Sequence, residues 1–208
     1  MARNFLFYNI IIAALTLSLH LNASANESCS TFFASDQFLN TLKFNIPENR
    51  KVDLLVKRQS QDELDTWSTQ GVFVIEKSTA ASFAAAMQFE RIQQMAPFMN
   101  IFEISSDRKK IQCGIKILPG LSFKQNLQIR VNEKKQLINL LFTEGPFAGF
   151  QGQIRFIEIN ETQTAVTLLS SGRVVNTQIP FFITTSVLES LSKAVINRWR
   201  TQIESEDE

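Results

Sequence analysis

Residues Ile111 to Val131 read IQCGIKILPGLSFKQNLQIRV, and this stretch contains two runs in which apolar and polar side chains alternate. Every second side chain of a β-strand points to the same face, so alternation marks a strand with one buried face. The pattern therefore predicts two half-buried strands of an antiparallel sheet. The apolar phase consists of Ile111, Cys113, Ile115 and Ile117 in the first run and Phe123, Leu127, Ile129 and Val131 in the second.

Upstream of this stretch the sequence predicts strands first and then helices. Residues 52–57 and 71–76 are predicted strands, joined by a polar stretch from Gln59 to Asp65. Ser78 or Thr79 can cap a helix whose buried face is predicted from the i, i+4 pair Phe83 and Met87. A second short helix carries Phe89, Ile92 and Met95 and must end before Pro97. Residues 98–104 form a predicted strand that is apolar on both faces.

Downstream the sequence predicts further strands and one long helix. The strands cover residues 136–142, 153–159 and 164–170, and a glycine-dense turn at 145–152 follows the first of them. After Pro180 a long helix is predicted from apolar residues at i+4 intervals. These residues are Val187, Leu191, Val195, Trp199 and Ile203. Strands and helices in this order indicate the α+β class.

Residues 1–25 have the pattern of a secretory signal. Arg3 supplies a positive charge, residues 10–21 form a short apolar region, and Ala23-Ser24-Ala25 has the small residues that signal peptidase recognises. We expect cleavage after Ala25 and a periplasmic location. A retained membrane anchor is the alternative, but polar residues interrupt the apolar run, whereas a spanning helix needs about 20 predominantly apolar residues.

The rest of the chain is predicted to form a single domain with short flanking parts. Residues 26–50 are an N-terminal extension with an amphipathic helix at 30–44, residues 51–203 are the domain, and residues 204–208 are an acidic tail that we expect to fray. The chain has two cysteines, and in an oxidising compartment we predict that Cys29 and Cys113 form a disulfide. The alternative is a buried free Cys113 on the same strand face as Ile111.

The composition excludes several classes of function. The chain has 21 basic and 20 acidic side chains, whereas nucleic-acid binding needs a clear basic excess, so we expect no nucleic-acid partner. The only histidine, His20, and the only tyrosine, Tyr8, lie in the predicted signal. The working chain therefore lacks imidazole catalysts and imidazole metal ligands. Ser190–Lys193 matches an SxxK motif without its partner motifs. We expect no catalytic residues, no metal and no cofactor.

Three stretches carry a resemblance to a known family. They are GVFVIEKS at 71–78 with MAPFM at 95–99, EGPF at 144–147 with Gly152, and the helix from Pro180 to Trp199. Together they resemble the START-like superfamily, also called SRPBCC or helix-grip, and within it the coenzyme Q-binding and polyketide cyclase-like branch. The resemblance covers residues 52–203. Its motifs are positions that determine the fold, and none is a catalytic signature.

The resemblance implies a helix-grip fold, in which a curved antiparallel sheet of about seven strands wraps around the C-terminal helix. Two short helices follow the first strand of that fold. It also implies a hydrophobic ligand, such as a lipid, quinone or polyketide, held in a cavity between sheet and helix. Sixteen of the 18 phenylalanines follow residue 25, which suits an apolar-lined site, although core packing is the more frequent role of any one of them.

We expect the site between the concave face of the sheet and the C-terminal helix, with the turn 145–152 at its mouth. We also expect a monomer that binds a hydrophobic small molecule or lipid, and we leave a transient membrane contact open. The expected ligand-binding residues are Met87, Met95, Phe98, Phe102, Phe123, Phe142, Phe147, Phe156, Leu168, Val187, Leu191 and Val195.

Two other function classes remain open at this point. A cyclase- or aromatase-like enzyme would position a reactive substrate and use charged strand residues for modest acid–base help. The candidates are Glu103, Arg130, Glu144, Arg155 and Glu158, each of which we expect to be solvated. The other class is a protein-interaction module whose core is filled and has no cavity.

Overall fold

A computed structural model of the chain describes residues 51–61, 64–118, 121–145, 147–175 and 181–205. The predicted signal, the predicted helix at 30–44 and Cys29 lie outside these residues. Among the described residues, no helix combines the length and apolar character needed to cross a membrane. The elements in chain order, with η for a 3₁₀ helix, are β1 Asp53–Gln61, β2 Leu64–Ile75, α3 Thr79–Ala86, η2 Phe89–Arg91, α4 Ile92–Met95, β3 Met99–Ile104, β4 Lys110–Leu118, β5 Leu121–Asn132, η3 Glu133–Lys135, β6 Leu137–Glu144, β7 Gln151–Asn160, β8 Gln163–Val175 and α5 Phe181–Glu204.

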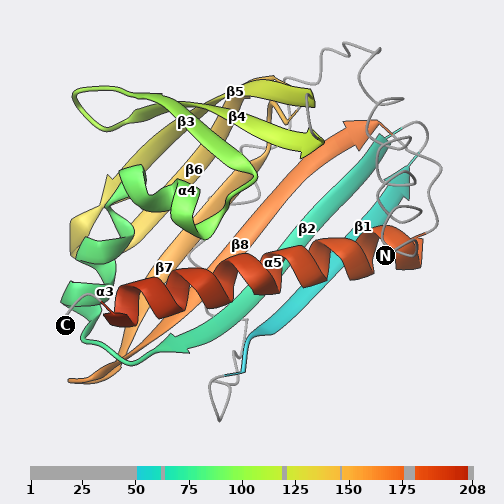
Figure 1. The fold of residues 1–208 in the computed structure, drawn as a ribbon. Coiled ribbons are helices and arrows are strands. Elements are labelled where there is room, and N and C mark those ends of the chain that lie inside the picture. Colours follow the sequence, from blue (N-terminus) through green and yellow to red (C-terminus); the bar gives the residue numbers. More distant parts are fainter. Residues whose placement is uncertain (1–50, 62–63, 119–120, 146, 176–180, 206–208) are drawn as a thin grey trace, which may run out of the picture.

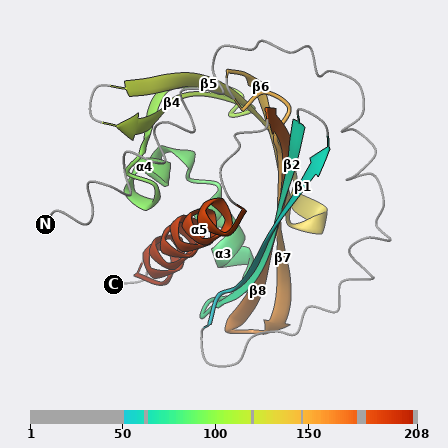
Figure 2. The same cartoon turned by 90° about the vertical axis from the view of Figure 1, so that its right-hand side faces the viewer.

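All the described strands belong to one antiparallel sheet of eight strands, in the order β1-β2-β8-β7-β6-β5-β4-β3 (Figure 1). The sheet curves around α5, and α3 and α4 lie on the same concave side (Figure 2). This arrangement confirms the predicted α+β fold with a C-terminal helix gripped by a curved sheet. The described sheet has eight strands rather than the about seven that the resemblance implied, and the strand predicted at 52–57 is the edge strand β1 next to β2.

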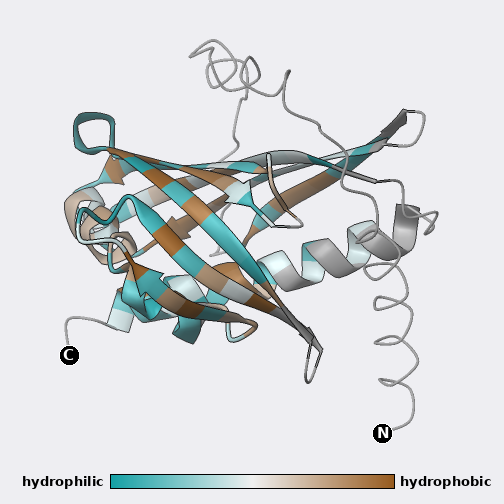
Figure 3. Cartoon of the chain, turned by 90° about the horizontal axis from the view of Figure 1, so that it is seen from above, coloured by the Kyte–Doolittle hydropathy of each residue, from teal (hydrophilic) through white to brown (hydrophobic). Residues whose placement is uncertain are grey.

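The alternating sequence of β4 and β5 produces the buried concave face that the sequence predicted. Ile111, Cys113, Leu127 and Ile129 are all nearly inaccessible to solvent, and Ile111 lies directly opposite Leu127. The strands seen in Figure 3 carry hydrophobic and hydrophilic residues in turn along their length. One face of the sheet therefore packs against the helices and the other carries most of the polar side chains.

The first hairpin is longer than the sequence predicted. The polar stretch Gln59–Asp65, predicted to be a connection, instead forms the ends of β1 and β2, whose pairing continues to Gln61 opposite Leu64. Apolar periodicity cannot detect such strand ends, because backbone hydrogen bonds and cross-strand pairs hold them rather than an apolar stripe. The correction extends the concave face by several residues on each strand.

Helix α3 begins where predicted, since the Ser78 side chain accepts a hydrogen bond from the Ala81 N–H at 3.3 Å. The predicted pair Phe83 and Met87 is half-buried and packs against the core, while the fully buried residues of the helix are Thr79, Ser82 and Ala86. Small side chains let the helix approach β8 closely. There Thr164 Oγ1 lies 3.1 Å from Thr79 Oγ1 and 2.8 Å from the Lys77 carbonyl oxygen.

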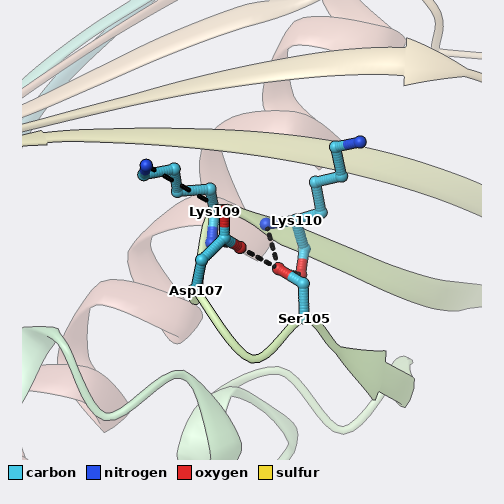
Figure 4. A network of polar contacts seen from close by, with 4 residues as sticks. All are labelled: Ser105, Asp107, Lys109 and Lys110. Carbon is cyan, nitrogen blue, oxygen red and sulfur yellow. Dashed lines mark hydrogen bonds and ion pairs between the residues drawn. The ribbon is translucent and has the colours of Figure 1, made fainter.

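Internal hydrogen bonds hold the β3–β4 turn, and Arg108 connects this turn to the helical segment after α3. Ser105 Oγ donates to Asp107 Oδ1 at 2.7 Å and accepts from the Lys110 N–H at 2.9 Å (Figure 4). The hydrogen bond from Ser105 and a second one from the Lys109 backbone N–H lower the pKa of Asp107. Arg108, at φ 56°, then reaches the Met87 carbonyl oxygen at 3.1 Å and the Glu90 carboxylate at 2.7 Å. The turn thus fastens the β3 edge of the sheet to the segment after α3.

Helix α5 contacts the edge strand β1 and its neighbour β2, and it also contacts the helices α3 and α4. Of the α5 side chains that the structure describes, Ile196, Trp199 and Ile203 are buried. At its C-terminal end, Glu204 Oε1 accepts a hydrogen bond from the Glu76 N–H at 3.0 Å. Glu204, which the sequence analysis placed in the fraying tail, is therefore tied to the end of β2.

Candidate functional site

The concave face has two halves that differ in how completely they are closed. Near α3, the aromatic rings of the sheet and of α5 pack against one another. Trp199 lies 5.8 Å from Phe73 and 6.1 Å from Phe156, and Phe156 makes an edge-to-face contact with Phe83 at 5.5 Å. Phe73 and Phe156 are only 0% and 3% exposed, so this half is a filled hydrophobic core.

The other half holds aromatic side chains that face inward but are only half-buried. Phe142, Phe147 and Phe150 form a chain of ring contacts, with centroids 6.3 Å and 5.9 Å apart. The ring of Phe150 covers the backbone of Gly172 so closely that a Cβ at that position would clash with it. Inward-facing rings that solvent still reaches are surface that a hydrophobic ligand could cover.

The first hairpin adds a tryptophan and a buried ion pair to this half. Trp67 is paired with Gly172 across β2 and β8, which places it next to the residue that Phe150 covers. The Arg58 guanidinium lies 5.4 Å above the Trp67 ring and 2.6 Å from Asp65 Oδ2. The side chains of Arg58 and Asp65 are 7% and 0% exposed. Trp67 is itself buried, at 8% exposed. We call the three half-buried rings of Phe142, Phe147 and Phe150, which Trp67 adjoins, the aromatic strip.

Two buried polar groups on β4 and β5 adjoin the aromatic strip. Cys113 and Gln125 are paired across these strands, and both are almost completely buried. Gln125 Oε1 accepts a hydrogen bond from the Phe147 N–H at 3.4 Å. Cys113 is a free thiol, and burial raises its pKa. Cys29 lies outside the described residues, so the Cys29–Cys113 disulfide stays a prediction. The burial of Cys113 on the Ile111 face is what the alternative expects.

Two predicted ligand-binding residues are not on the concave face. Phe102 is 50% exposed and covers Gly114 on the opposite, convex face. A register shift between Ile101 and Glu103 inserts an extra residue, so Met99, Ile101 and Ile104 pack inward instead. Phe98, which is 37% exposed, lies in the turn before β3. These two placements were wrong, because periodicity cannot assign a face to a strand that is apolar on both.

The remaining predicted residues divide between the two halves. Phe142 and Phe147 belong to the aromatic strip, and Phe123 is half-buried opposite Ile115 on the same face. Phe156 belongs to the filled core, and Met87 and Leu168 pack against its margin. On α5, Val195 is half-buried and its neighbour Ile196 is buried in its place. The side chains of Met95, Val187 and Leu191 lie outside what the structure describes.

The charged strand residues considered for acid–base chemistry lie largely in solvent. Glu103, Arg130, Glu144 and Glu158 are exposed, and Arg155 is half-buried. Among the described residues, Arg58 and Asp65 are buried charged side chains on the concave face, and the sequence analysis missed them. Their signal was present, since Arg58 shares the phase of Leu54 and Val56, and Asp65 and Trp67 share the phase of Phe73.

Comparison with known proteins finds the same fold in proteins of very different sequence. Neither a family profile nor a curated protein matches the chain. The Zhui aromatase/cyclase from Streptomyces sp. R1128 has a TM-score of 0.56 at 10% identity, covering 69% of this chain and 96% of that one. A START superfamily protein from Mycobacterium smegmatis has a TM-score of 0.54 at 11% identity, covering 66% and 97%. A conserved protein from Geobacillus kaustophilus has a TM-score of 0.52 at 13% identity, covering 64% and 93%.

The chain therefore has the START-like, or helix-grip, fold that its sequence resembles. At this level of identity the similarity defines the fold alone, and the function must be argued from the residues of the concave face.

Proposed function

We propose that this protein binds a hydrophobic small molecule, such as a lipid, a quinone or a polyketide-like compound, between the concave face and α5. The observation that carries the proposal is the half-buried state of the inward-facing aromatic strip, beside a core half that is fully closed. Apolar side chains that face inward without being covered gain free energy when a ligand excludes water from them.

The role that we propose is that of an extracytoplasmic carrier or sensor rather than an enzyme. The signal-like residues 1–25 support export to the periplasm, and the absence of histidine and tyrosine after residue 25 supports a binding role. Ring contacts and apolar surface provide affinity without requiring a reactive group.

Lipid extracts of the protein purified from its native host test this proposal directly. Mass spectrometry should find one class of hydrophobic compound in reproducible, near-stoichiometric amount. A Phe142→Ala variant purified in the same way should retain less of it, whereas Lys57→Ala, an exposed change on β1, should retain the same amount. Protein that is reproducibly empty, and that binds no apolar probe in solution, would count against the proposal.

A second candidate function is that of a cyclase- or aromatase-like enzyme. The observation that favours it is the buried Arg58–Asp65 pair on the concave face, since charged groups held away from water can polarise a bound substrate. The fold shared with an aromatase/cyclase is consistent with this role. Incubation with a reactive poly-β-carbonyl chain would decide between the two, because an enzyme changes the product distribution at substoichiometric protein and a carrier does not.

A further inference from the structure

Gln125 is a polar side chain in an apolar position of the candidate site. It lies on the concave phase of β5, between Phe123 and Leu127 and opposite Cys113, and it is only 1% exposed. Its amide lies directly against Gly145, where an added Cβ would be 2.6 Å from both Oε1 and Nε2. The amide is therefore enclosed between the concave face and the turn that carries Phe147.

The hydrogen bonding of Gln125 defines which end of the amide is still available. The Phe147 N–H donates a hydrogen bond to one of the two terminal amide atoms of Gln125, so that atom must be the oxygen Oε1. The other atom is therefore the nitrogen Nε2, which is a donor. Nε2 is buried and has no hydrogen-bond partner among the described residues. A buried donor without an acceptor is unfavourable, and native proteins rarely keep one without a reason.

The surroundings of Nε2 define what kind of acceptor suits it. Phe147, whose backbone holds the Gln125 oxygen, places its ring between Phe142 and Phe150 in the aromatic strip. The donor thus belongs to the side chain that holds the Phe147 backbone, and the Phe147 ring favours stacked or edge-to-face contact with another flat ring. Because Nε2 can only donate, it prefers a carbonyl oxygen to a group that offers a proton alone.

We propose that Gln125 Nε2 donates a hydrogen bond to a carbonyl oxygen of the bound ligand, and that the ligand is a flat apolar ring bearing such a carbonyl. This inference rests on the proposed function and narrows it to carbonyl-bearing ring compounds. Since Nε2 is enclosed, entry of the oxygen requires the turn to shift. Gly145 and Gly149, at φ +89° and +88°, give its backbone the necessary freedom.

The test compares duroquinone with durene, which have the same tetramethyl ring with and without carbonyl oxygens. Duroquinone has no free ring position for a thiol such as Cys113 to attack. Affinities are measured by isothermal titration for the wild-type protein and for Gln125→Leu. We expect the variant to bind duroquinone roughly two- to tenfold more weakly, as loss of one hydrogen bond predicts, and to bind durene no less tightly than the wild type does.

Gln153→Leu is the matched control, because Gln153 is a buried glutamine of β7 that already donates to Asn139 at 3.1 Å. It should change neither affinity. Equal affinities of a folded Gln125→Leu and the wild type for duroquinone would overturn the inference, as would an equal loss for both probes. If Gln125→Leu does not fold, Gln125→Met replaces it. If neither variant folds, a wild-type protein that does not prefer duroquinone to durene overturns the inference.

Failure of the proposed function gives a different result. A wild-type protein that binds neither probe nor any other apolar compound contradicts the binding role itself. A wild-type protein that binds both probes equally, with no effect of Gln125→Leu, contradicts only the role of Gln125.

Discussion

Arg58 and Asp65 join the edge strand β1 to the rest of the concave face. The ion pair runs diagonally across the β1–β2 hairpin, and Arg58 also lies over the ring of Trp67. Removing two charges from water is costly, and the mutual attraction of a buried pair repays this cost only when both partners are present. The intact pair should therefore add little net stability, whereas loss of one partner should be costly.

Asp65→Ala should consequently destabilise the fold by about 3–5 kcal/mol, because it removes the carboxylate that balances the buried Arg58 charge. The double variant Arg58→Met with Asp65→Leu should lose much less, since it buries no charge. Urea unfolding measures both, with exposed Lys57→Ala as the control on β1. A single variant as stable as the double variant would show that the pair does not act in this way.

The buried thiol of Cys113 makes the free energy of unfolding depend on pH. Burial raises the pKa of its thiol above the ordinary value of 9.0, so the folded state holds the proton more tightly than the unfolded state does. This contribution is fully present below pH 9.0 and is lost as the pH rises through the folded-state pKa. The unfolding free energy should thus fall more steeply above pH 9.0 in the wild type than in Cys113→Ala.

Urea unfolding at a series of pH values measures this difference. Identical pH slopes for the two proteins would contradict a buried, protonated Cys113. Thiol counting on denatured, non-reduced protein gives an independent check, since a free Cys113 reacts with a thiol reagent under those conditions and a disulfide-bonded one does not.

At the scale of elements, the turn between β6 and β7 contains two glycines with the same backbone conformation and different surroundings. Gly145 and Gly149 have φ of +89° and +88°. A Cβ on Gly145 would lie 2.5 Å from the Lys124 carbonyl oxygen and 2.6 Å from the Gln125 amide, whereas a Cβ on Gly149 would meet nothing within 4 Å. Substitution of these two glycines therefore distinguishes the cost of backbone strain from the cost of a steric clash.

Gly149→Ala should therefore cost about 1–2 kcal/mol, the usual penalty for a left-handed conformation with a Cβ. Gly145→Ala should cost clearly more, because the backbone of β5 must also move. It should weaken apolar ligand binding too, since it displaces the amide of Gln125. Chemical denaturation of both variants tests this ranking, and equal losses would mean that the turn relaxes around the added methyl group.

The same scale explains which parts of the fold the sequence could predict. Strict alternation in β4 and β5 identified their buried faces correctly, because the apolar side chains of each strand lie on one face only. In β3 the extra residue between Ile101 and Glu103 exchanges the two faces in mid-strand, which no period of two can represent. Residues spaced by four on a helix rotate by 40° at each step, so the predicted α5 stripe drifts and Ile196 replaces Val195 on the buried face.

The candidate site was predicted in part for similar reasons. Phe142 and Phe147 were named because aromatic residues beside a glycine-dense turn are conspicuous. Trp67 and Arg58 were missed because polar neighbours surround them, although they share the phase of Phe73 and of Leu54 and Val56. Gln125 carried a readable signal, since it is the one polar residue on the apolar phase between Phe123 and Val131. A polar residue at a core position usually has a specific hydrogen-bonding role.

At the scale of the whole molecule, the two halves of the concave face differ in how completely they are closed. The half near α3 is closed by α5 through Trp199 and Ile203, while the aromatic strip in the other half stays half-buried. A sheet with strong twist and curvature cannot contact a straight helix along its full length. One half therefore packs, and the proposed function assigns the ligand to the other half.

Substitutions in the two halves should thus have opposite profiles. Phe156→Ala leaves a cavity in the filled core and should cost about 3–5 kcal/mol of stability. Phe142→Ala removes a half-buried ring and should cost about 1–2 kcal/mol, in proportion to the smaller apolar area lost. Its main effect should be weaker binding of an apolar fluorescent probe, whereas folded Phe156→Ala should bind the probe nearly as the wild type does. Chemical denaturation and probe titration measure the two properties separately. Equal losses of stability and of probe binding in the two variants would show that the concave face is a single continuous core with no ligand half.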